Sequence, residues 1–539
     1  MVERESVFRR IDRFVRAEMK TARIPGIALA LTDREFLVRA STYGYADLSA
    51  RARVTPETLF EIGSIGKSFT AIALLQEVEA GRLDLQAPIT DYLPWIAVRS
   101  PYGPITAHHL LSHTAGLIMG TEFSTEARFE TWALRDTEVG FPPGARFHYS
   151  NVGYKALGLL LEALTGKHPG EVIRSCILEP LGMVATAPRI THETRTRLAV
   201  GYCDLYDDRP SSPRHPLVPA TWLETDTADG SIATTAEDLA VYLRMLLNRG
   251  RGPQGPILSE ESFRLLTRRV IACDEGTRAG FYGYGLDVTE QNGHAMLGHG
   301  GGMVGYISSV LMDADAGLGV VVLTNAIREI SGIAQASMRL LRAGVAGERL
   351  PRLPGPGNPP KVKRPADYAG TYRGRAKDLV VEAEGDRLVL RLDDSDVLLE
   401  SRGADRFYVD HPDLDRFLLS FRRYDDRVVE VFYGPDRFVR GDDAGPTDVG
   451  APSAWSAFAG HYRAHNPWFP NFRVVVQKDA LVLIRPEGIE EPLVPLPSGA
   501  FRVGKEEHFP ERIRFETILD GNALRANLSG CDYYRTFTP

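Results

Sequence analysis

The sequence predicts a large α+β domain followed by two small antiparallel β-barrels. The chain has 539 residues, more than one hydrophobic core usually holds. A proline-rich stretch and a second stretch rich in Gly, Asp and Pro divide it, and short runs of alternating hydrophobic residues follow each of them. These observations place the large domain at 1–350, a linker at 351–365, a barrel at 366–441, a linker at 442–455 and a second barrel at 456–539.

Strands are expected at both ends of the large domain, with helices between them. Alternating hydrophobic residues predict one hairpin that starts at Gly26 and turns at Asp33–Arg34. A second hairpin starts at Tyr306 and turns at Asp315–Gly317. Helical spacing of hydrophobic residues is found at 1–20, 64–80, 154–164, 236–248 and 333–343. This order predicts an antiparallel sheet built from the chain ends, flanked by helices, with a helical region inserted in the middle.

The two small domains repeat each other. One opens with the segment Tyr368–Arg373 and the other with the similar segment Phe458–Arg463, and the same rhythm of short strands follows each. Such a repeat indicates a duplicated β-barrel module. Neither copy carries a cluster of residues that suggests chemistry.

Composition narrows the possible partners. Apolar residues make up 43% of the chain, charged residues 25%, and the net charge is −7 without a block of like charge. We therefore expect no nucleic-acid or membrane partner. The first twenty residues are typical of an amphipathic helix and not of a signal peptide, and the four cysteines lie far apart. We expect a cytoplasmic protein with a small-molecule or short-peptide substrate; a homodimer stays open.

A Ser-x-x-Lys pair, Ser64 and Lys67, begins the first central helix. At this spacing the two side chains share one face of the helix. A serine hydroxyl becomes nucleophilic when a neighbouring base takes its proton, and a lysine can serve if it is neutral. Taken alone, such a pair is more often an exposed Ser and Lys in a first helical turn.

Two further motifs follow along the chain. In Tyr-Ser-Asn, Tyr149 offers a second proton-transfer group, and Asn151 can both donate to and accept from an amide. In His299-Gly-Gly-Gly, Gly301 and Gly302 would let a substrate approach the backbone of the second hairpin closely. Each motif alone is also compatible with an ordinary turn.

Two competing interpretations fail. His109 and His113 are spaced as zinc ligands on a helix can be, but no acidic partner accompanies them, so we assign them structural roles. The His-Gly-Gly-Gly run also resembles the oxyanion motif of α/β-hydrolases, which requires a Gly-x-Ser-x-Gly elbow that the chain lacks.

In combination, Ser-x-x-Lys at 64, Tyr-x-Asn at 149 and His-Gly-Gly at 299 resemble the motif set of the serine β-lactamase and penicillin-recognising superfamily, in its class C-like branch. The stretch Leu110–Leu117 strengthens the resemblance, which covers about residues 10–345. It implies a β-lactamase-like fold without cofactor or metal. It also implies a covalent ester on Ser64, with Lys67 and Tyr149 sharing the proton transfers.

The resemblance implies roles for the remaining motif residues. Asn151 would orient the acyl-side amide of the substrate. His299 would be a further catalytic residue, which shapes the site and helps to hydrogen-bond Tyr149 or the leaving group. The backbone N–H groups of Ser64 and Gly302 would hold the oxyanion, with Gly301 beside them.

One departure from the family motifs and the order of the domains modify the expected function. The third motif is His-Gly-Gly where secreted β-lactamases usually carry Lys-Thr-Gly, so a charge that pairs with a substrate carboxylate is missing. A β-lactamase-like domain followed by two lipocalin-like barrels resembles the D-aminopeptidases of this superfamily. Our first choice is a D-amino-acid-specific aminopeptidase or amidase. The alternatives are a carboxylesterase or class C-like β-lactamase, or a non-catalytic penicillin-binding sensor.

Two hypotheses concern substrate selection. An aminopeptidase needs an anion for the substrate ammonium, and Asp226 or Asp229 could supply it, although Asp before a helix is commonly a cap. In the second barrel, Trp468 and Phe469 stand between two prolines. They could restrict the Ser64 cleft, or they could plug the end of their own barrel.

Overall fold

The computed structural model describes residues 4–120, 126–273, 280–353, 355, 361–392, 395–441 and 450–536. Parts of both predicted linkers, 354 and 356–360 in one and 442–449 in the other, lie outside the described residues. The chain forms two compact units. The first contains Met1–Cys203 and Leu217–Pro356, and the second contains Asp204–Pro216 and Gly357–Pro539.

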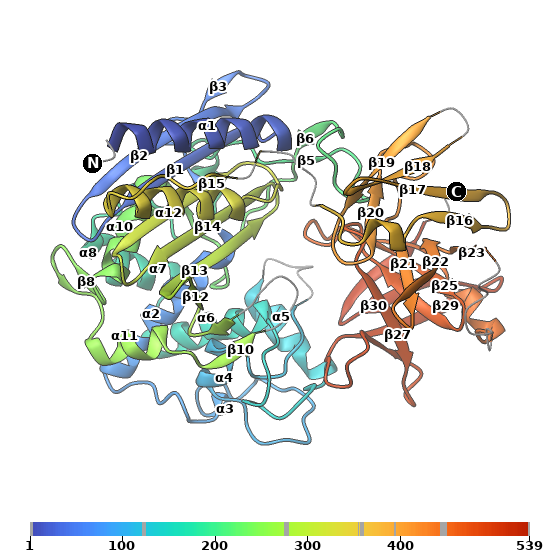
Figure 1. Ribbon diagram of the computed structural model, residues 1–539. Coiled ribbons are helices and arrows are strands. Elements are labelled where there is room, and N and C mark those ends of the chain that lie inside the picture. Colours follow the sequence, from blue (N-terminus) through green and yellow to red (C-terminus); the bar gives the residue numbers. More distant parts are fainter. Residues whose placement is uncertain are drawn as a thin grey trace. The chain divides into compact units, whose positions relative to one another are not determined.

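Within the described part of the first unit, nine strands form one antiparallel sheet in the order β10-β11-β12-β13-β14-β15-β1-β2-β3 (Figure 1). Both ends of the large domain contribute to it, because β1 pairs with β15 as well as with β2. The strands are β10 Ile271–Cys273, β11 Gly280–Tyr282, β12 Asp287–Gln291, β13 His294–Met303, β14 Tyr306–Asp313, β15 Leu318–Thr324, β1 Gly26–Thr32, β2 Leu37–Asp47 and β3 Ala52–Arg53. This confirms the predicted sheet and both hairpins.

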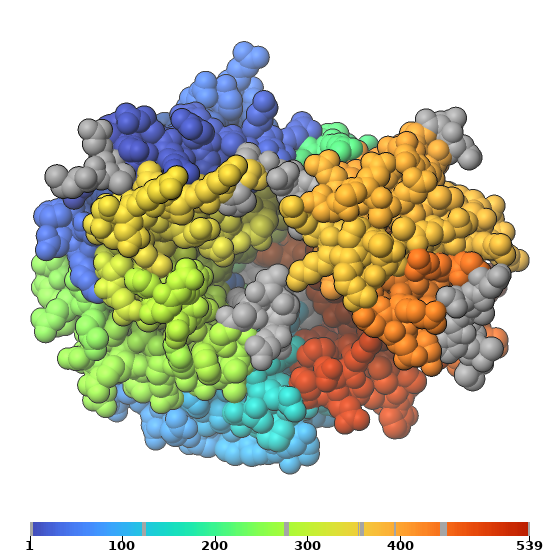
Figure 2. Space-filling model, viewed as in Figure 1, coloured from blue at the N-terminus to red at the C-terminus, as the bar shows by residue number. Residues whose placement is uncertain are grey.

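Helices cover both faces of this sheet. On one face, α1 (Arg4–Ala22) and α12 (Ser331–Val345) pack over alternate residues of β1 and β15, such as Leu29 and Val320. They run side by side on the surface, α1 dark blue and α12 yellow (Figure 2). The intervening residues of the same strands, such as Ala30 and Val321, face α10 (Ala236–Leu247) and the helical region. Both central strands are therefore buried along their whole length.

The helical region centres on α2, Gly66–Glu79, which is buried on almost every side. It packs against α6, Asn151–Thr165. This helix starts three residues before its hydrophobic pattern predicts, because Ser150 caps it by accepting a hydrogen bond from the Gly153 N–H at 3.1 Å. The other helices of the unit are α3 Ile89–Tyr92, α4 Ala107–Leu111, α5 Ala127–Ala133, α7 Pro169–Ile173, α8 Glu179–Leu181, α9 His192–Arg195 and α11 Glu260–Thr267.

The second unit contains two closed barrels of eight antiparallel strands each (Figure 1). The first comprises β16 Gly370–Arg373, β17 Asp378–Glu384, β18 Arg387–Arg391, β19 Asp396–Ser401, β20 Arg406–Val409, β21 Leu419–Tyr424, β22 Arg427–Tyr433 and β23 Asp436–Arg440. The second comprises β24 Gly460–Arg463, β25 Asn471–Gln477, β26 Ala480–Ile484, β27 Glu490–Pro495, β28 Phe501–Val503, β29 Arg512–Leu519, β30 Asn522–Leu528 and β31 Cys531–Arg535.

Equivalent hydrogen bonds support the predicted duplication. In the first barrel the buried Tyr372 hydroxyl donates to the carbonyl of Tyr368 at 2.7 Å. In the second, Tyr462 donates to the carbonyl of Phe458 at 2.8 Å. The repeated opening segments therefore adopt the same local structure in the two barrels.

Candidate active site around Ser64

Ser64 lies in a tight turn, Gly63–Ile65, that runs directly into α2. Its side chain is half-buried, and the following helix places its positive dipole end near the hydroxyl. Gly63 has a φ of +51°, and a Cβ there would lie 2.6 Å from the Gly302 carbonyl oxygen. Only glycine fits between these two backbones, so the turn holds Ser64 against β13.

Lys67 lies one helical turn after Ser64 and is fully buried. Its Nζ lies 3.0 Å from Ser64 Oγ, 2.8 Å from Asn151 Oδ1 and 2.8 Å from the backbone carbonyl oxygen of Asp229. The ring of Tyr149 is 5.0 Å away. A lysine ammonium has three N–H donors, and these three acceptors match them. The geometry brings together Ser64, Lys67, Tyr149 and Asn151, as the sequence predicts.

Tyr149 and Asn151 are positioned by the start of α6 and by His113. The Asn151 N–H donates to the carbonyl of Met119 at 2.6 Å. His113 adopts a left-handed backbone conformation, its Nδ1 accepts from the Ser150 N–H at 3.0 Å, and its ring lies 4.2 Å from that of Tyr149. His113 therefore supports Tyr149, a role that the sequence left unspecified.

His109 also has a structural partner. It completes a capping box with Thr106 at the start of α4.

Gly301 and Gly302 lie on β13 where the strand passes the Ser64 turn. Strand β12 stops opposite Gly298, whereas β14 continues beside β13 as far as Met303. Along the described chain, the end of β13 therefore has a strand neighbour on one side only. A Cβ on Gly301 would lie 1.8 Å from the Ile62 carbonyl oxygen, which shows how closely the two backbones approach.

His299 is buried beneath this strand end, with 2% of its surface exposed. Its Nδ1 lies 2.5 Å from the carbonyl oxygen of Gly300, which can only accept, so Nδ1 carries a proton. Nε2 lies 3.1 Å from the hydroxyl of Tyr282, which then donates to it in the neutral ring. The ring is thus engaged at both nitrogens and belongs to the wall of the site.

The two predicted anions differ in their surroundings. Asp226 is half-exposed and accepts from His168 Nε2 at 3.0 Å, and this hydrogen bond lowers the pKa of Asp226. Asp229 is 9% exposed, and its Oδ1 is buried without a hydrogen-bond partner among the described residues. Because the carbonyl of the same residue binds Lys67, Asp229 is the acid of this segment that adjoins the Ser64 site.

Trp468 and Phe469 belong to the second barrel. The ring of Phe469 lies 5.9 Å from those of both Phe472 and Tyr533, and Tyr533 donates to its carbonyl at 3.0 Å. Asn466 Oδ1 accepts from both loop N–H groups, at 3.0 Å from Trp468 and 3.2 Å from Phe469. Phe469 thus packs on its own barrel, while Trp468 is partly exposed.

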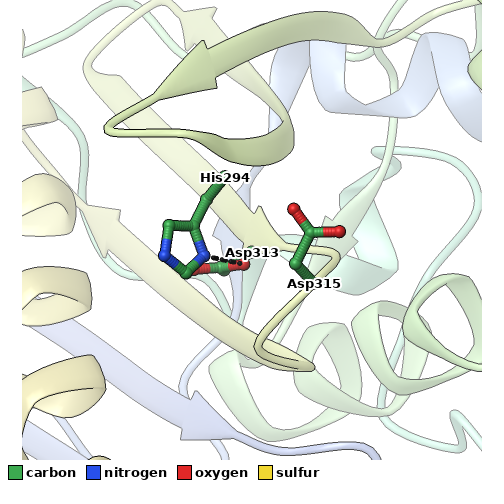
Figure 3. Close-up of side chains that lie close together, drawn as sticks. All are labelled: His294, Asp313 and Asp315. Atoms are coloured by element: carbon green, nitrogen blue, oxygen red, sulfur yellow. Dashed lines mark hydrogen bonds and ion pairs between the residues drawn. The ribbon is translucent and has the colours of Figure 1, made fainter.

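One cluster in the described residues has the donor set of a metal site: His294, Asp313 and Asp315 (Figure 3). Asp313 forms ion pairs with Arg342 of α12 and with His294 Nδ1, the latter at 3.0 Å. Asp315 accepts from the Ala295 N–H at 2.8 Å. Because these groups already engage one another, we assign the cluster to closing the β12–β13 and β14–β15 turns and not to binding a cation.

Comparison with known proteins agrees with this arrangement of motifs. A family model described as Beta-lactamase matches residues 11–339. The chain belongs to the beta-lactamase family.

No helix among the described residues is long and apolar enough to cross a membrane.

Relatives within the beta-lactamase family include penicillin-binding proteins. Penicillin-binding protein 4 of Amycolatopsis lactamdurans is 29% identical over 366 residues, covering 65% of this chain and 93% of the relative. The octameric penicillin-binding protein homologue from Pyrococcus abyssi is 27% identical, with a TM-score of 0.59 over 80% of this chain and 100% of that one. The D-amino acid amidase from Ochrobactrum anthropi SV3 shares the fold at 24% identity and a TM-score of 0.54, over 64% of this chain and 99% of that one.

Proposed function

We propose that this protein is a serine hydrolase that forms an acyl-enzyme on Ser64, with peptides or amides of D-amino acids as its first-choice substrates. The observation that carries the proposal is the 3.0 Å contact between Lys67 Nζ and Ser64 Oγ inside a buried polar cluster. Lys67 and Tyr149 share the transfer of the Ser64 proton as Oγ attacks the carbonyl carbon. The same groups return that proton to the leaving amine, and water then hydrolyses the ester.

The developing oxyanion lies between the backbone N–H groups of Ser64 and Gly302. The close approach of Gly63 to Gly302 supports this assignment, because a preorganised pair of donors must be rigid. Asn151 binds Lys67 through Oδ1 at 2.8 Å. Its amide nitrogen is then oriented away from that oxygen and serves the acyl-side carbonyl of the substrate.

The environment of His299 favours an amidase or aminopeptidase over a β-lactamase. A β-lactam carries a carboxylate that a lysine of the third motif would pair with. Here the position holds a buried histidine whose two nitrogens contact Gly300 and Tyr282. It offers no fixed positive charge to a substrate carboxylate. A carboxylesterase likewise needs no fixed positive charge at this position, and it is the second candidate.

Asp229 is our candidate for binding the ammonium group of the substrate. Its buried Oδ1 has no hydrogen-bond partner among the described residues, and a desolvated carboxylate oxygen gains most from a cationic partner. Asp226 is already bound to His168. Replacing Asp229 with Asn should lower the ratio of kcat/KM for a free-amine substrate to that for its N-acetylated form, whereas Asp226→Asn should leave the ratio unchanged. An unchanged ratio in Asp229→Asn would contradict the assignment.

The experiment that tests the function is a substrate panel assayed with the wild type and with Ser64→Ala. It contains D- and L-amino-acid p-nitroanilides, short p-nitrophenyl esters and nitrocefin. We expect the fastest amide turnover with a free-amine D-residue, all of it dependent on Ser64. A burst of one equivalent without further turnover would instead support a penicillin-binding sensor.

Two predictions accompany the proposal: fractionation should find the protein in the cytoplasm, and size-exclusion chromatography should show whether it is a homodimer.

A further inference from the structure

A loop of the beta-lactamase-like domain groups with the barrels and not with its own domain. This anchor loop, Asp204–Pro216, lies between β5 (Tyr202–Asp204) and β6 (Leu217–Pro219), which pair at its base. The chain therefore passes between the two units three times, after 203, after 216 and after 356. The predicted linker at 351–365 is only the last of these passages.

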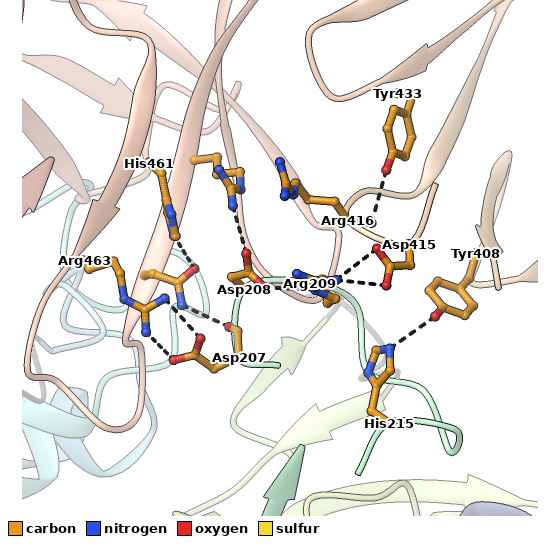
Figure 4. Close-up of polar contacts among 12 residues, drawn as sticks. Asp207, Asp208, Arg209, His215, Tyr408, Asp415, Arg416, Tyr433, His461 and Arg463 are labelled. Carbon is orange, nitrogen blue, oxygen red and sulfur yellow. Dashed lines mark hydrogen bonds and ion pairs between the residues drawn. The ribbon is translucent and has the colours of Figure 1, made fainter. Parts of the chain in front are cut away.

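The acidic half of the anchor loop binds the second barrel (Figure 4). Asp208 forms an ion pair with Arg473 at 2.9 Å, and Asp207 pairs with Arg463. The Asn471 side chain donates to the backbone carbonyl of Asp207 at 3.0 Å. Side chain and backbone of the loop are thus both recognised by strands β24 and β25.

The basic half binds the first barrel. Arg209 donates to both carboxylate oxygens of Asp415, at 2.9 and 3.1 Å (Figure 4). Arg214 pairs with Asp410, and His215 Nε2 lies 3.4 Å from the Tyr408 hydroxyl. The loop therefore places acidic side chains against arginines of the second barrel and basic side chains against acids of the first barrel. This charge complementarity sets the position of the loop on both barrels.

The central ion pairs of this contact are shielded from water. The side chains of Asp208, Arg473, Arg209 and Asp415 are each less than a fifth exposed. Burial alone would raise the pKa of Asp208, but its hydrogen bonds and charge contacts with Arg209 and Arg473 outweigh burial and lower that pKa. Buried ion pairs of this kind are screened by salt much less than surface pairs.

The base of the anchor loop packs on the turn that follows the oxyanion strand. Gly305 joins β13 to β14, and a Cβ there would lie 2.7 Å from Gly201 Cα and 2.8 Å from Ala220 Cβ. Gly201 and Ala220 flank the loop and are joined by a backbone hydrogen bond of 2.8 Å. The segments that flank the loop in the chain therefore lie close to the turn three residues after Gly302.

We propose that the anchor loop is a non-covalent clasp that holds the barrel pair to the beta-lactamase-like domain and couples it to the β13–β14 turn. Its partner is the charged surface formed by Asp410, Asp415, Arg463 and Arg473 of this same chain. The attachment does not depend on the linker at 351–365. The barrels thereby steady the strand that carries Gly302, and this second part rests on the proposed function.

The clasp is tested by cutting the linker in the full-length folded protein. A specific protease site replaces residues 356–360, and the cut protein is run on size-exclusion chromatography. We expect the two fragments of the parent to co-elute, and those of Arg209→Asp to separate. Arg209→Asp combined with Asp415→Arg should co-elute again. The control Arg13→Asp makes the same charge change at an exposed residue of α1 and should co-elute. Separation of the parent fragments, or co-elution of Arg209→Asp, would overturn the clasp.

The coupling is tested by turnover of a small p-nitrophenyl ester in the uncut variants. Because displacing an oxyanion donor by a fraction of an ångström lowers kcat, we expect Arg209→Asp to lose about tenfold in kcat with little change in KM, and the double variant to recover. An unchanged kcat in a variant whose fragments separate would overturn the coupling. If the parent itself has no Ser64-dependent turnover, the proposed function fails, while co-elution still decides the clasp.

Discussion

Lys67 and Asn151 are joined by a hydrogen bond of 2.8 Å, although 84 residues separate them in the chain. The same Nζ contacts Ser64 Oγ at 3.0 Å. The lysine therefore holds the Ser64 hydroxyl and the Asn151 amide in one geometry. Its hydrogen bond of 2.8 Å to the Asp229 carbonyl brings a third distant segment to the same nitrogen.

Lys67 and Tyr149 should act as one proton relay. Lys67→Ala and Tyr149→Phe should each lower kcat for ester hydrolysis by several orders of magnitude, and the double variant should be little worse than either single one. Steady-state kinetics on one ester substrate measures this. Losses that multiply in the double variant would contradict a shared relay.

Gly301→Ala should disable the site, because the new Cβ would lie 1.8 Å from the Ile62 carbonyl oxygen and force β13 away from the Ser64 turn. We expect kcat to fall at least about a hundredfold, the loss that removing one oxyanion donor causes. Gly300→Ala is the matched control, because its Cβ meets no atom nearer than 3.9 Å. Equal kcat values for the two variants would show that the close approach of the two backbones does not matter.

Glu61 should make the folded protein less stable as pH rises. Burial raises the pKa of Glu61 from 4.5 to about 8, so the folded state keeps a proton that the unfolded state has lost. Stability should therefore fall between about pH 4.5 and pH 8, by up to about 5 kcal/mol, because each pKa unit corresponds to about 1.4 kcal/mol.

Glu61→Gln should flatten this decline, as measured by urea unfolding at pH 6 and at pH 9. The control Glu57→Gln removes an exposed carboxyl four residues away and should keep the decline of the parent. If Glu61→Gln loses as much stability between the two pH values as the parent does, the buried carboxyl is not its cause.

The loop that carries Trp468 and Phe469 should limit substrate length if it closes the Ser64 cleft. Replacing residues 466–470 with a Gly-Ser turn should then admit longer acyl chains without slowing the smallest ester. A series of p-nitrophenyl esters of increasing chain length measures this. The packing of Phe469 on Phe472 and Tyr533 favours the alternative, in which the loop only plugs its barrel. In that case the replacement lowers the melting temperature and leaves the chain-length profile unchanged.

Much of the fold could be predicted because its patterns are local. The alternation of Ile27, Leu29 and Leu31 with Ala28 and Ala30 marks a strand buried on both faces, and it is visible within seven residues. The duplicated barrels could be recognised because the sequence repeats its opening segment. The start of α6 was missed by three residues because a capping serine, and not periodicity, determines it.

The site was predicted less completely, because its contacts join distant segments. Nothing in the residues around Asp229 indicates that its carbonyl binds a lysine 162 residues earlier. The support of Tyr149 by His113 depends on a left-handed backbone conformation. The anchor loop was also not foreseen, since its charges acquire meaning only beside Asp415 and Arg473.

Mass spectrometry of the quenched reaction can show whether Ser64 is the residue that substrate acylates. The protein is mixed with a slowly deacylating p-nitrophenyl ester, quenched in acid and digested. We expect one acyl group per chain on the peptide that contains Ser64, and no such group in Ser64→Ala, which should also lose turnover. An acyl group on another residue, or near-native turnover by Ser64→Ala, would show that Ser64 is not the nucleophile.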